Sequence, residues 1–324
     1  MAGLSASPLN GPIARFAASI YGAGWELRRR AHASGWLRQR RVAARVVSIG
    51  NLTVGGTGKT TLTLHLAAVA RARGLQGAVV CGSYRPGPAG LGDEELLYQG
   101  FIRGGGPGIR SKSARAESAV EAGARFILVD DGFSHWPLAR DLDVVLLDRT
   151  NLWGGGRLLP AGWLREPRRA LQRAGLIVIS RLGPDEDPAP FYSEVRPFAP
   201  AARFAAGRHA VAGVRTLSGE PCEAGGGALV VTATGNPGAV ASSAREAGFT
   251  EVSLRAFRDH HWFTEVEARQ LLREAGSRML LMTAKDAVRW PLSTHDPRVS
   301  VLEVAWTWCA GGAAAESLIF GEGA

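Results

Sequence analysis

A glycine-rich segment, SIGNLTVGGTGKT at residues 48–60, constrains the fold of this chain more than any other feature. The apolar run Val46 to Ile49 leads into it, and a helical pattern of apolar residues follows from Lys59. A strand, a glycine-rich loop and a helix in this order form a phosphate-binding loop, or P-loop. The strict form of this loop has glycine where this chain has Thr53. The segment therefore predicts a nucleotide-binding α/β core, and the alternative is a glycine-rich turn without function.

The side chains of this loop suit nucleotide phosphates. Backbone N–H groups converge on phosphate oxygens in such a loop, and we expect Lys59 to reach the β and γ phosphates and the Thr60 hydroxyl to ligate Mg²⁺. The chain has only three lysines, Lys59, Lys112 and Lys285, beside 35 arginines, so lysine is not its default base. The expected nucleotide-binding residues are Thr53, Val54, Gly55, Gly56, Thr57, Gly58, Lys59 and Thr60.

From residue 45 onward, short apolar runs alternate with helical patterns, which is typical of β-α-β units and a mainly parallel sheet. A length of 324 residues favours two lobes, and the segment GPDEDPAP at 183–190 is typical of a linker. We therefore expect a P-loop core at 45–182, a linker at 183–198 and a second, smaller α/β lobe at 199–324. Strands are expected at 46–49, 78–81, 126–129, 144–147, 176–179, 229–232, 252–254, 279–282 and 299–304, and helices after Lys59, Asp93 and Ala114 and at 239–247 and 265–274.

The overall composition, 46% hydrophobic and 21% charged, is that of an ordinary globular protein and excludes a low-complexity, collagen-like or multispan membrane chain. Cys81, Cys222 and Cys309 are far apart in the sequence, so neither a disulfide framework nor a zinc site is expected. Their free state fits a reducing cytosol.

Most of the positive charge lies in the first residues of the chain. Residues 1–45 carry eight arginines and one acid, a net charge of +7 out of +9 for the whole chain, which argues against a nucleic-acid-binding face spread over a domain. After Pro12, apolar residues recur at helical spacing, and the apolar stretch is too short to cross a bilayer. We therefore predict that residues 1–44 form an amphipathic arm on an anionic membrane, with the stripe Ile13, Phe16, Ile20, Gly24 and Leu27 in contact with lipid. The alternative is a helix that packs this stripe on the body of the protein.

Acidic residues supply the remaining candidates for chemistry. Asp130 and Asp131 end an apolar strand, where P-loop proteins hold Mg²⁺, although the Asp-Asp-Gly turn could only terminate the strand. Asp93 begins an expected helix, where it is either a helix-start acid or a carboxylate that accepts a proton from an acceptor hydroxyl. Glu94 is a further candidate for the metal. The cluster Asp259-His260-His261 lacks other ligands at zinc spacing, so no structural metal site is expected there.

Eight short motifs follow one another along most of residues 46–290. They are SIGNLTVGGTGKT (48–60), GDE (92–94), VDDGFSH (129–135), RDLDVVLLD (140–148), LLPAGWLREP (158–167), TGNP (234–237), FRDHHWF (257–263) and MTAKDAV (282–288). In this order they resemble the tetraacyldisaccharide 4'-kinase family of lipid A biosynthesis. The resemblance also accounts for Thr53, because the loop of this family lacks the first glycine.

The resemblance implies roles for individual residues. Asp93 takes the position of the catalytic base and His260 the position that supports it, while Lys59 and Thr60 act on phosphate and magnesium. Asp130 and Asp131 form the acidic pair near the metal. Arg110, Arg165 and Glu166 match family positions expected near substrate or nucleotide, although Arg165 and Glu166 could simply form a helix-entry turn. This chain departs from the family pattern at Ser134, where glutamine is usual, and at Ala284, where glutamate is usual.

The resemblance implies a P-loop kinase that uses ATP and Mg²⁺. Its acceptor would be the 4' hydroxyl of a tetraacyldisaccharide 1-phosphate, and its product lipid IVA. We expect a peripheral protein on the cytoplasmic face of the bacterial inner membrane, with no nucleic acid and no obligate protein partner. The rival interpretation is a regulatory or metallochaperone-type P-loop NTPase that acts through a protein partner.

Overall fold

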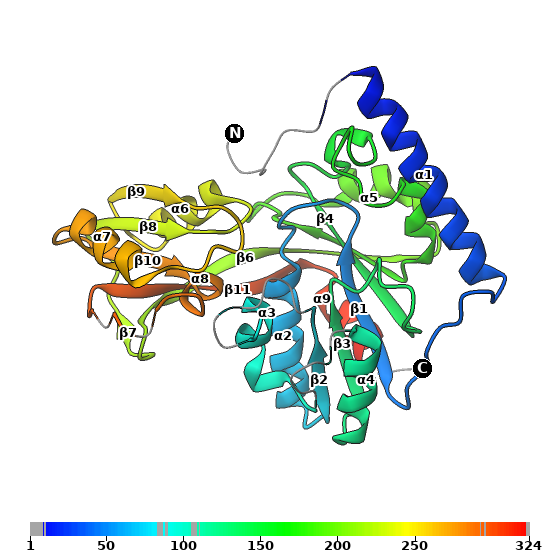
Figure 1. The fold of residues 1–324 in the computed structure, drawn as a ribbon, viewed down its shortest axis with the longest axis horizontal. Helices are drawn as coiled ribbons and strands as arrows, with labels where there is room; N and C mark the ends of the chain where they lie inside the picture. Colours follow the sequence, from blue (N-terminus) through cyan, green and yellow to red (C-terminus); the bar gives the residue numbers. More distant parts are fainter. Residues whose placement is uncertain are drawn as a thin grey trace. The chain divides into compact units, whose positions relative to one another are not determined.

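The computed structural model describes residues 9, 11–82, 87, 90–104, 109, 111–291, 293–294 and 296–321 (Figure 1). The chain divides into two compact units. Of the described residues, those within 7–82, 100–209 and 306–324 form the P-loop unit, and those within 83–99 and 210–305 form the second unit. Strands β6 (Arg203–Thr216) and β11 (Val299–Ala310) each have residues in both units.

The P-loop unit is built on a parallel sheet in the order β2-β3-β1-β4-β5-β6. Its central strands are buried along their whole length, as expected for parallel strands covered on both faces. The order reverses between β1 and β4, so the P-loop lies at a switch point of the sheet, where ligands bind in folds of this kind. The remaining strands of the unit are β1 (Arg45–Asn51), β2 (Gly77–Val80), β3 (Phe126–Asp130), β4 (Leu142–Asp148) and β5 (Leu176–Ser180).

Helices cover this sheet, and Figure 1 shows α2 and α4 beside β1, β2 and β3. Small and apolar residues of α4 pack with β3 in one buried cluster. A larger cluster joins β4 and β5 to the segment around residues 191–206. The helices are α1 (Pro12–Ala33), α2 (Lys59–Ala72), α4 (Lys112–Glu121), α5 (Ala189–Val195) and α9 (Gly312–Phe320), with short helices η1 (Gln99–Phe101), η2 (Gly154–Gly156), η3 (Arg168–Arg173) and η4 (Arg196–Phe198).

The second unit contains a smaller parallel sheet in the order β11-β10-β8-β9. One buried cluster includes Phe263 and Trp290, whose rings lie 5.4 Å apart. This cluster includes Leu229 and Val231 of β8. A second cluster contains Ala228 and Val230 of β8 together with residues of α6. The elements of this unit are α3 (Asp93–Leu97), β7 (Pro221–Cys222), β8 (Gly227–Thr232), α6 (Pro237–Glu246), β9 (Glu251–Ala256), α7 (Glu265–Ala275), β10 (Met279–Thr283) and α8 (Ala284–Ala287).

The expected strands and helices are all present, but the expected division of the chain is not. Residues 183–198 are not a linker, because α5 and η4 form there and Val195 is fully buried in the P-loop unit. The polar residues that indicated a linker make a local turn, in which Glu186 accepts a hydrogen bond from the Gly183 amide at 2.8 Å. The division falls instead after His209, and residues 83–99 belong to the second unit.

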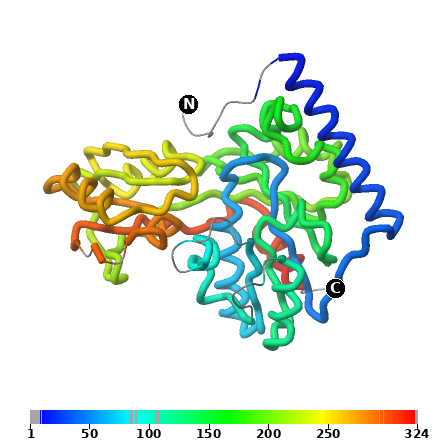
Figure 2. Tube along the Cα trace, viewed as in Figure 1, coloured from blue at the N-terminus to red at the C-terminus, as the bar shows by residue number. Residues whose placement is uncertain are grey.

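Helix α1 runs along one side of the P-loop unit (Figures 1 and 2). Ala14 and Ala18 pack against Ala161, so small residues make this contact. The large apolar residues point away from it: Ile13, Phe16, Ile20 and Leu27 are 84%, 69%, 59% and 68% exposed. The alternative in which this stripe packs on the body is therefore wrong. Among the described residues, no helix combines the length and apolar character needed to cross a bilayer.

Candidate active site

The P-loop connects the end of β1 to the first turn of α2. Gly58 adopts a left-handed conformation with φ 93°, which suits glycine, and Lys59 is the first helical residue. The loop is held by the segment after residue 162. The Val54 amide donates to the Trp163 carbonyl at 2.8 Å, and the Arg165 amide donates to the Leu52 carbonyl at 2.7 Å.

The acidic pair follows β3 and lies beside this loop. Asp131 Oδ1 is 3.6 Å from Lys59 Nζ, and the guanidinium of Arg165 binds both carboxylate oxygens of Asp131, at 2.7 and 2.8 Å. Lys112 Nζ donates to the carbonyls of Asp130 and Asp131, at 2.6 and 2.8 Å. Three cationic side chains therefore converge on the turn that carries the pair.

This turn requires glycine at position 132. A Cβ there would lie 2.6 Å from the Ser48 side chain, closer than real Cβ contacts. Asp131 itself has φ 49°, a left-handed conformation that aspartate tolerates better than most residues. The Asp-Asp-Gly sequence thus brings the acidic pair against β1 instead of merely ending a strand.

The charge of Asp131 is stabilised by its neighbours. Burial alone would raise the pKa of this carboxyl, but the Lys59 charge and the bonds from Arg165 lower it far below its usual range. Asp131 is therefore ionised at any physiological pH. An ionised carboxylate beside a P-loop lysine is what a metal–phosphate complex needs.

Asp93 forms a second charged cluster, in the second unit. Its side chain is only 2% exposed, and its Oδ2 accepts a hydrogen bond from His260 Nδ1 at 2.8 Å. Lys285 Nζ and Arg289 Nε each lie 3.8 Å from the same oxygen. The other oxygen accepts from the Glu94 amide at 2.9 Å, so Asp93 is a helix-start acid as well as the partner of a histidine.

The cluster keeps Asp93 ionised. Burial raises the pKa of its carboxyl, whereas the hydrogen bond from His260 and the charge of Lys285 lower it, and the net effect is a pKa below the ordinary value of 3.8. His260 has φ 60°, and its amide donates to Asp259 Oδ1 at 3.0 Å. The adjacent His261 instead stacks on Phe257 with ring centroids 4.9 Å apart.

Asp286 holds the cationic side of this cluster in place. It is fully buried and accepts hydrogen bonds from the Thr232 and Thr283 hydroxyls, at 2.9 and 2.7 Å. It also accepts from the Arg289 guanidinium at 2.6 Å. Because Asp286 lies in α8 beside Lys285, these bonds fix both cations that face Asp93.

The structure therefore divides the sequence-based candidates between two groups. Lys59, Arg165 and Asp131 are in contact in the P-loop unit, and Asp93 with His260 are in contact in the second unit. The expectation that Asp93 belongs to the P-loop core is wrong, because residues 83–99 pack with the second unit.

Glu166, Glu94 and Arg110 are the remaining sequence-based candidates. Glu166 is buried and binds Arg173 at 2.9 Å, and Glu94 is half-buried. Arg110 lies outside the described residues. Among the described residues, no cluster of three or more histidine, cysteine, aspartate or glutamate side chains could hold a metal ion.

Sequence reasoning missed four contributors to these groups: Lys112, Lys285, Arg289 and Asn51, whose Oδ1 accepts from the Arg165 guanidinium. One signal for the two lysines was present. All three lysines of this arginine-rich chain lie in the two charged groups, so their rarity marked the candidate site.

Comparison with known proteins identifies the family. The sequence pattern of the tetraacyldisaccharide-1-P 4'-kinase family matches residues 12–319. The chain belongs to this family. The kinase activity and the lipid A pathway expected from the ordered motifs are thereby confirmed, and the regulatory NTPase is not favoured.

Individual relatives agree with the family match. A tetraacyldisaccharide 4'-kinase from Anaeromyxobacter sp. (strain Fw109-5) is 36% identical over 318 residues, which cover 89% of this chain and 85% of that protein. One from Anaeromyxobacter dehalogenans (strain 2CP-1 / ATCC BAA-258) is 39% identical over 293 residues, covering 79% and 74%. The crystal structure of an "apo" form of LpxK from Aquifex aeolicus in complex with ATP has the same fold, with a TM-score of 0.66, 22% identity and coverage of 94% and 96%.

Removing Asp286 should destabilise the second unit. Asp286→Ala leaves the buried Arg289 charge without its carboxylate partner, and breaking a buried pair in this way costs about 3–5 kcal/mol. Thermal and urea unfolding of the full chain measure this cost. Asp286→Ala/Arg289→Met removes both charges and should recover part of the loss; equal instability of the single and double variants would contradict the assigned role.

Proposed function

We propose that this family member transfers the γ-phosphoryl group of ATP to the 4' hydroxyl of a tetraacyldisaccharide 1-phosphate and so forms lipid IVA. The observation that carries the proposal is the buried Asp93–His260 pair, with 2.8 Å between Nδ1 and Oδ2. A P-loop alone is common to kinases, switches and hydrolases. A carboxylate kept ionised by a histidine is the additional group that a hydroxyl acceptor requires.

The P-loop residues stabilise the phosphoryl group. Loop amides from Thr53 to Thr60 and the Lys59 ammonium would bind the phosphate oxygens, whose negative charge must be compensated during transfer. Arg165 holds Asp131 through two hydrogen bonds, so we assign it the positioning of the acidic pair. Glu166 orients this segment through Arg173, and Arg110 stays a predicted substrate contact.

The donor set suits Mg²⁺. This ion prefers hard oxygen ligands, usually one or two carboxylates with several waters. Asp130, Asp131 and the Thr60 hydroxyl supply such oxygens, whereas Glu94 lies in the second unit and stays a weaker candidate. When bound, the ion would neutralise charge on the β and γ phosphates.

Asp93 and His260 would remove the proton of the acceptor hydroxyl. In the proposed reaction, the 4' hydroxyl oxygen attacks the γ-phosphorus, the bond to the β–γ bridging oxygen breaks, and the hydroxyl proton passes to the Asp93 carboxylate. Asp93 has a lowered pKa and is by itself a weak base. The imidazole of His260, bound to the same carboxylate, can share that proton. Lys285 and Arg289 lie 3.8 Å from Asp93 Oδ2 and preserve its charge.

Helix α1 supports a peripheral location at the membrane. Its exposed stripe of Ile13, Phe16, Ile20 and Leu27 presents apolar surface to the surroundings, and residues 1–45 carry a net charge of +7. Apolar residues and arginines on one helix favour an anionic bilayer surface, at about 1 kcal/mol per basic residue near it. We therefore place the enzyme on the cytoplasmic face of the inner membrane, where an acylated acceptor is met.

Replacing Lys59 should abolish transfer. Lys59→Ala removes the ammonium at the phosphates, whose charge the loop amides cannot replace. Thr60→Ala should weaken Mg²⁺ dependence and leave part of the activity. The measurement is transfer of labelled phosphate from ATP to the lipid acceptor, with unfolding curves as the folding control. Near-normal turnover of folded Lys59→Ala would refute the P-loop assignment.

Replacing Asp93 should lower kcat by roughly 10²–10⁴ with little change in ATP affinity, since that is the usual contribution of a general base. His260→Ala should cost less, and the double variant should cost less than the product of the two single losses, because the two groups act together. Because the pKa of Asp93 lies below 3.8, its ionisation should leave no inflection in kcat from about pH 5 to about pH 8.

Steady-state kinetics at saturating ATP test this pair. His260→Ala should also move the acid-side loss of rate to higher pH, because the hydrogen bond that lowers the pKa of Asp93 is gone. Two results would contradict the role of Asp93 as a base and leave it only a helix-start acid. One is a loss of kcat in the double variant equal to the product of the two single losses, and the other is an Asp93→Ala variant impaired only in ATP binding.

Membrane attachment should depend on the exposed stripe of α1. Ile13→Ser/Phe16→Ser/Ile20→Ser removes apolar surface that is largely exposed, so pelleting with anionic vesicles should fall while ATP binding persists. Ala17→Ser and Ala23→Ser on the same helix serve as controls. Unchanged pelleting of the triple variant in vesicle sedimentation assays would argue against this attachment.

A further inference from the structure

A basic cavity lies between the C-terminal half of α1 and η3, within the P-loop unit. Its volume is about 710 Å³, and both elements supply arginines to its wall. Glu26 is the only acid in that wall and is shared by Arg29, Arg30 and Arg169, at 2.7, 2.9 and 3.2 Å. One carboxylate therefore balances three guanidinium groups, and the cavity keeps a net positive charge.

The wall also contains buried donors that nothing satisfies. Trp25 is 8% exposed, and its indole Nε1 finds no hydrogen-bond partner among the described residues. The same holds for Nε and Nη1 of Arg173. Buried polar groups are normally hydrogen-bonded, and leaving one unpaired is destabilising. Such a group of orphaned donors in a basic wall indicates an anionic ligand.

Arg173 is a packed part of this wall and not a mobile surface charge. Its guanidinium lies between the rings of Phe133 and Trp136, 4.2 and 4.1 Å from their centroids. Burial lowers the pKa of this guanidinium against the opposing effect of Glu166. Stacked on both faces and bound to Glu166 on one side, it has donors left for a further anion.

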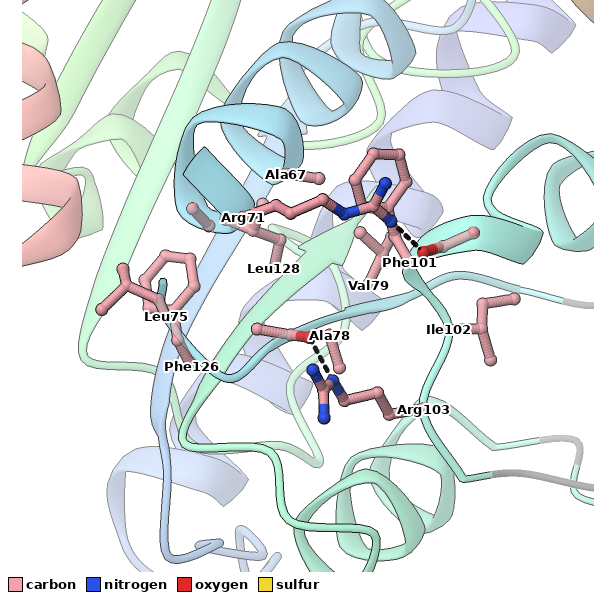
Figure 3. A pocket seen from close by; sticks show the side chains of 13 residues that line it. Ala67, Arg71, Leu75, Ala78, Val79, Phe101, Ile102, Arg103, Phe126 and Leu128 are labelled. Carbon is pink, nitrogen blue, oxygen red and sulfur yellow. Dashed lines mark hydrogen bonds between the residues drawn. The ribbon is translucent and has the colours of Figure 1, made fainter. Parts of the chain in front are cut away.

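A second cavity of the P-loop unit makes a useful contrast. It measures about 70 Å³, lies between α2 and β2, and also has two arginines in its wall (Figure 3). There Arg71 donates to the Gly100 carbonyl and stacks on Phe101, and Arg103 donates to the Gly77 carbonyl at 3.0 Å. These arginines have structural partners, so that cavity does not call for a ligand.

We propose that the cavity between α1 and η3 binds the phosphate group of a phosphorylated lipid at the membrane surface. The exposed apolar stripe and the cavity share α1, so a bilayer that contacts the stripe brings phosphate groups within reach of Arg29 and Arg30. The phosphate comes either from the acceptor, whose 1-phosphate suits the site, or from a bilayer phospholipid. The first source rests on the proposed function, whereas the second does not.

Soluble probes test the site without membrane partitioning. Isothermal titration with glucosamine 1-phosphate, and with dihexanoyl phosphatidylglycerol below its micelle concentration, should show saturable binding of at least one. Arg30→Gln/Arg169→Gln should lower that affinity by roughly 100-fold or more, because two charged hydrogen bonds are lost and each is worth about tenfold or more. Both side chains are largely exposed, 74% and 58%, so the fold should tolerate the change. Trp25→Phe keeps the ring, loses the donor and should cost up to about tenfold.

Arg15→Gln/Arg38→Gln is the matched control, because it also removes two guanidinium groups, both from the arm and both outside the cavity. It should bind both probes as the unchanged protein does. Tighter binding of the sugar phosphate identifies the acceptor as the source, and tighter binding of the phospholipid identifies the bilayer. Absence of saturable binding, or equal losses in cavity and control variants, would overturn the proposal.

Phosphate transfer by the unchanged protein, measured in parallel, separates this inference from the proposed function. Normal transfer without probe binding refutes only the cavity. Probe binding without transfer refutes only the kinase mechanism.

Discussion

Compensation of carboxylate charge is the constraint on which both charged groups depend. An ionised carboxylate removed from water is costly unless cations or donors replace its hydration. Asp131 and Asp93 each meet this requirement through residues distant in sequence. The compensating side chains are Lys59 and Arg165 for Asp131, with Lys112 on the adjacent carbonyls, and His260, Lys285 and Arg289 for Asp93.

The same compensation prepares these groups for chemistry. A carboxylate whose pKa is lowered stays charged near phosphate, where a neutral acid would be useless to a metal ion. It also becomes a weaker base, and this explains why the proposed proton acceptor is a pair and not a lone aspartate. Asp286 contributes indirectly, because it holds Arg289, one of the cations that face Asp93.

Helix α1 divides its functions between its faces. Alanines and Trp25 make the contact with the P-loop unit, which leaves the large apolar side chains free for a bilayer. Arginines at its C-terminal half join those of η3 around a cavity rich in unsatisfied donors. One helix would then provide both membrane attachment and phosphate recognition. The segment from Arg165 to η3 connects the cavity to the P-loop.

Local sequence determined the elements of this protein. The spacing of apolar residues located the strands and helices, and the glycine, lysine and acid positions located the P-loop, the acidic pair and the helix start at Asp93, because these features depend on neighbouring residues. Only tertiary structure decided which unit contains residues 83–99. The pairing of Asp93 with His260 was implied by the family resemblance and the outward face of α1 was one of two alternatives, and tertiary structure supplied the contacts for both. Each depends on contacts between segments more than a hundred residues apart, as in the 2.8 Å bond across 167 positions. The prediction of a linker from the acidic, proline-rich segment at 183–190 was wrong for the same reason. The composition of this segment indicates a turn, but it does not determine what the following helix packs against.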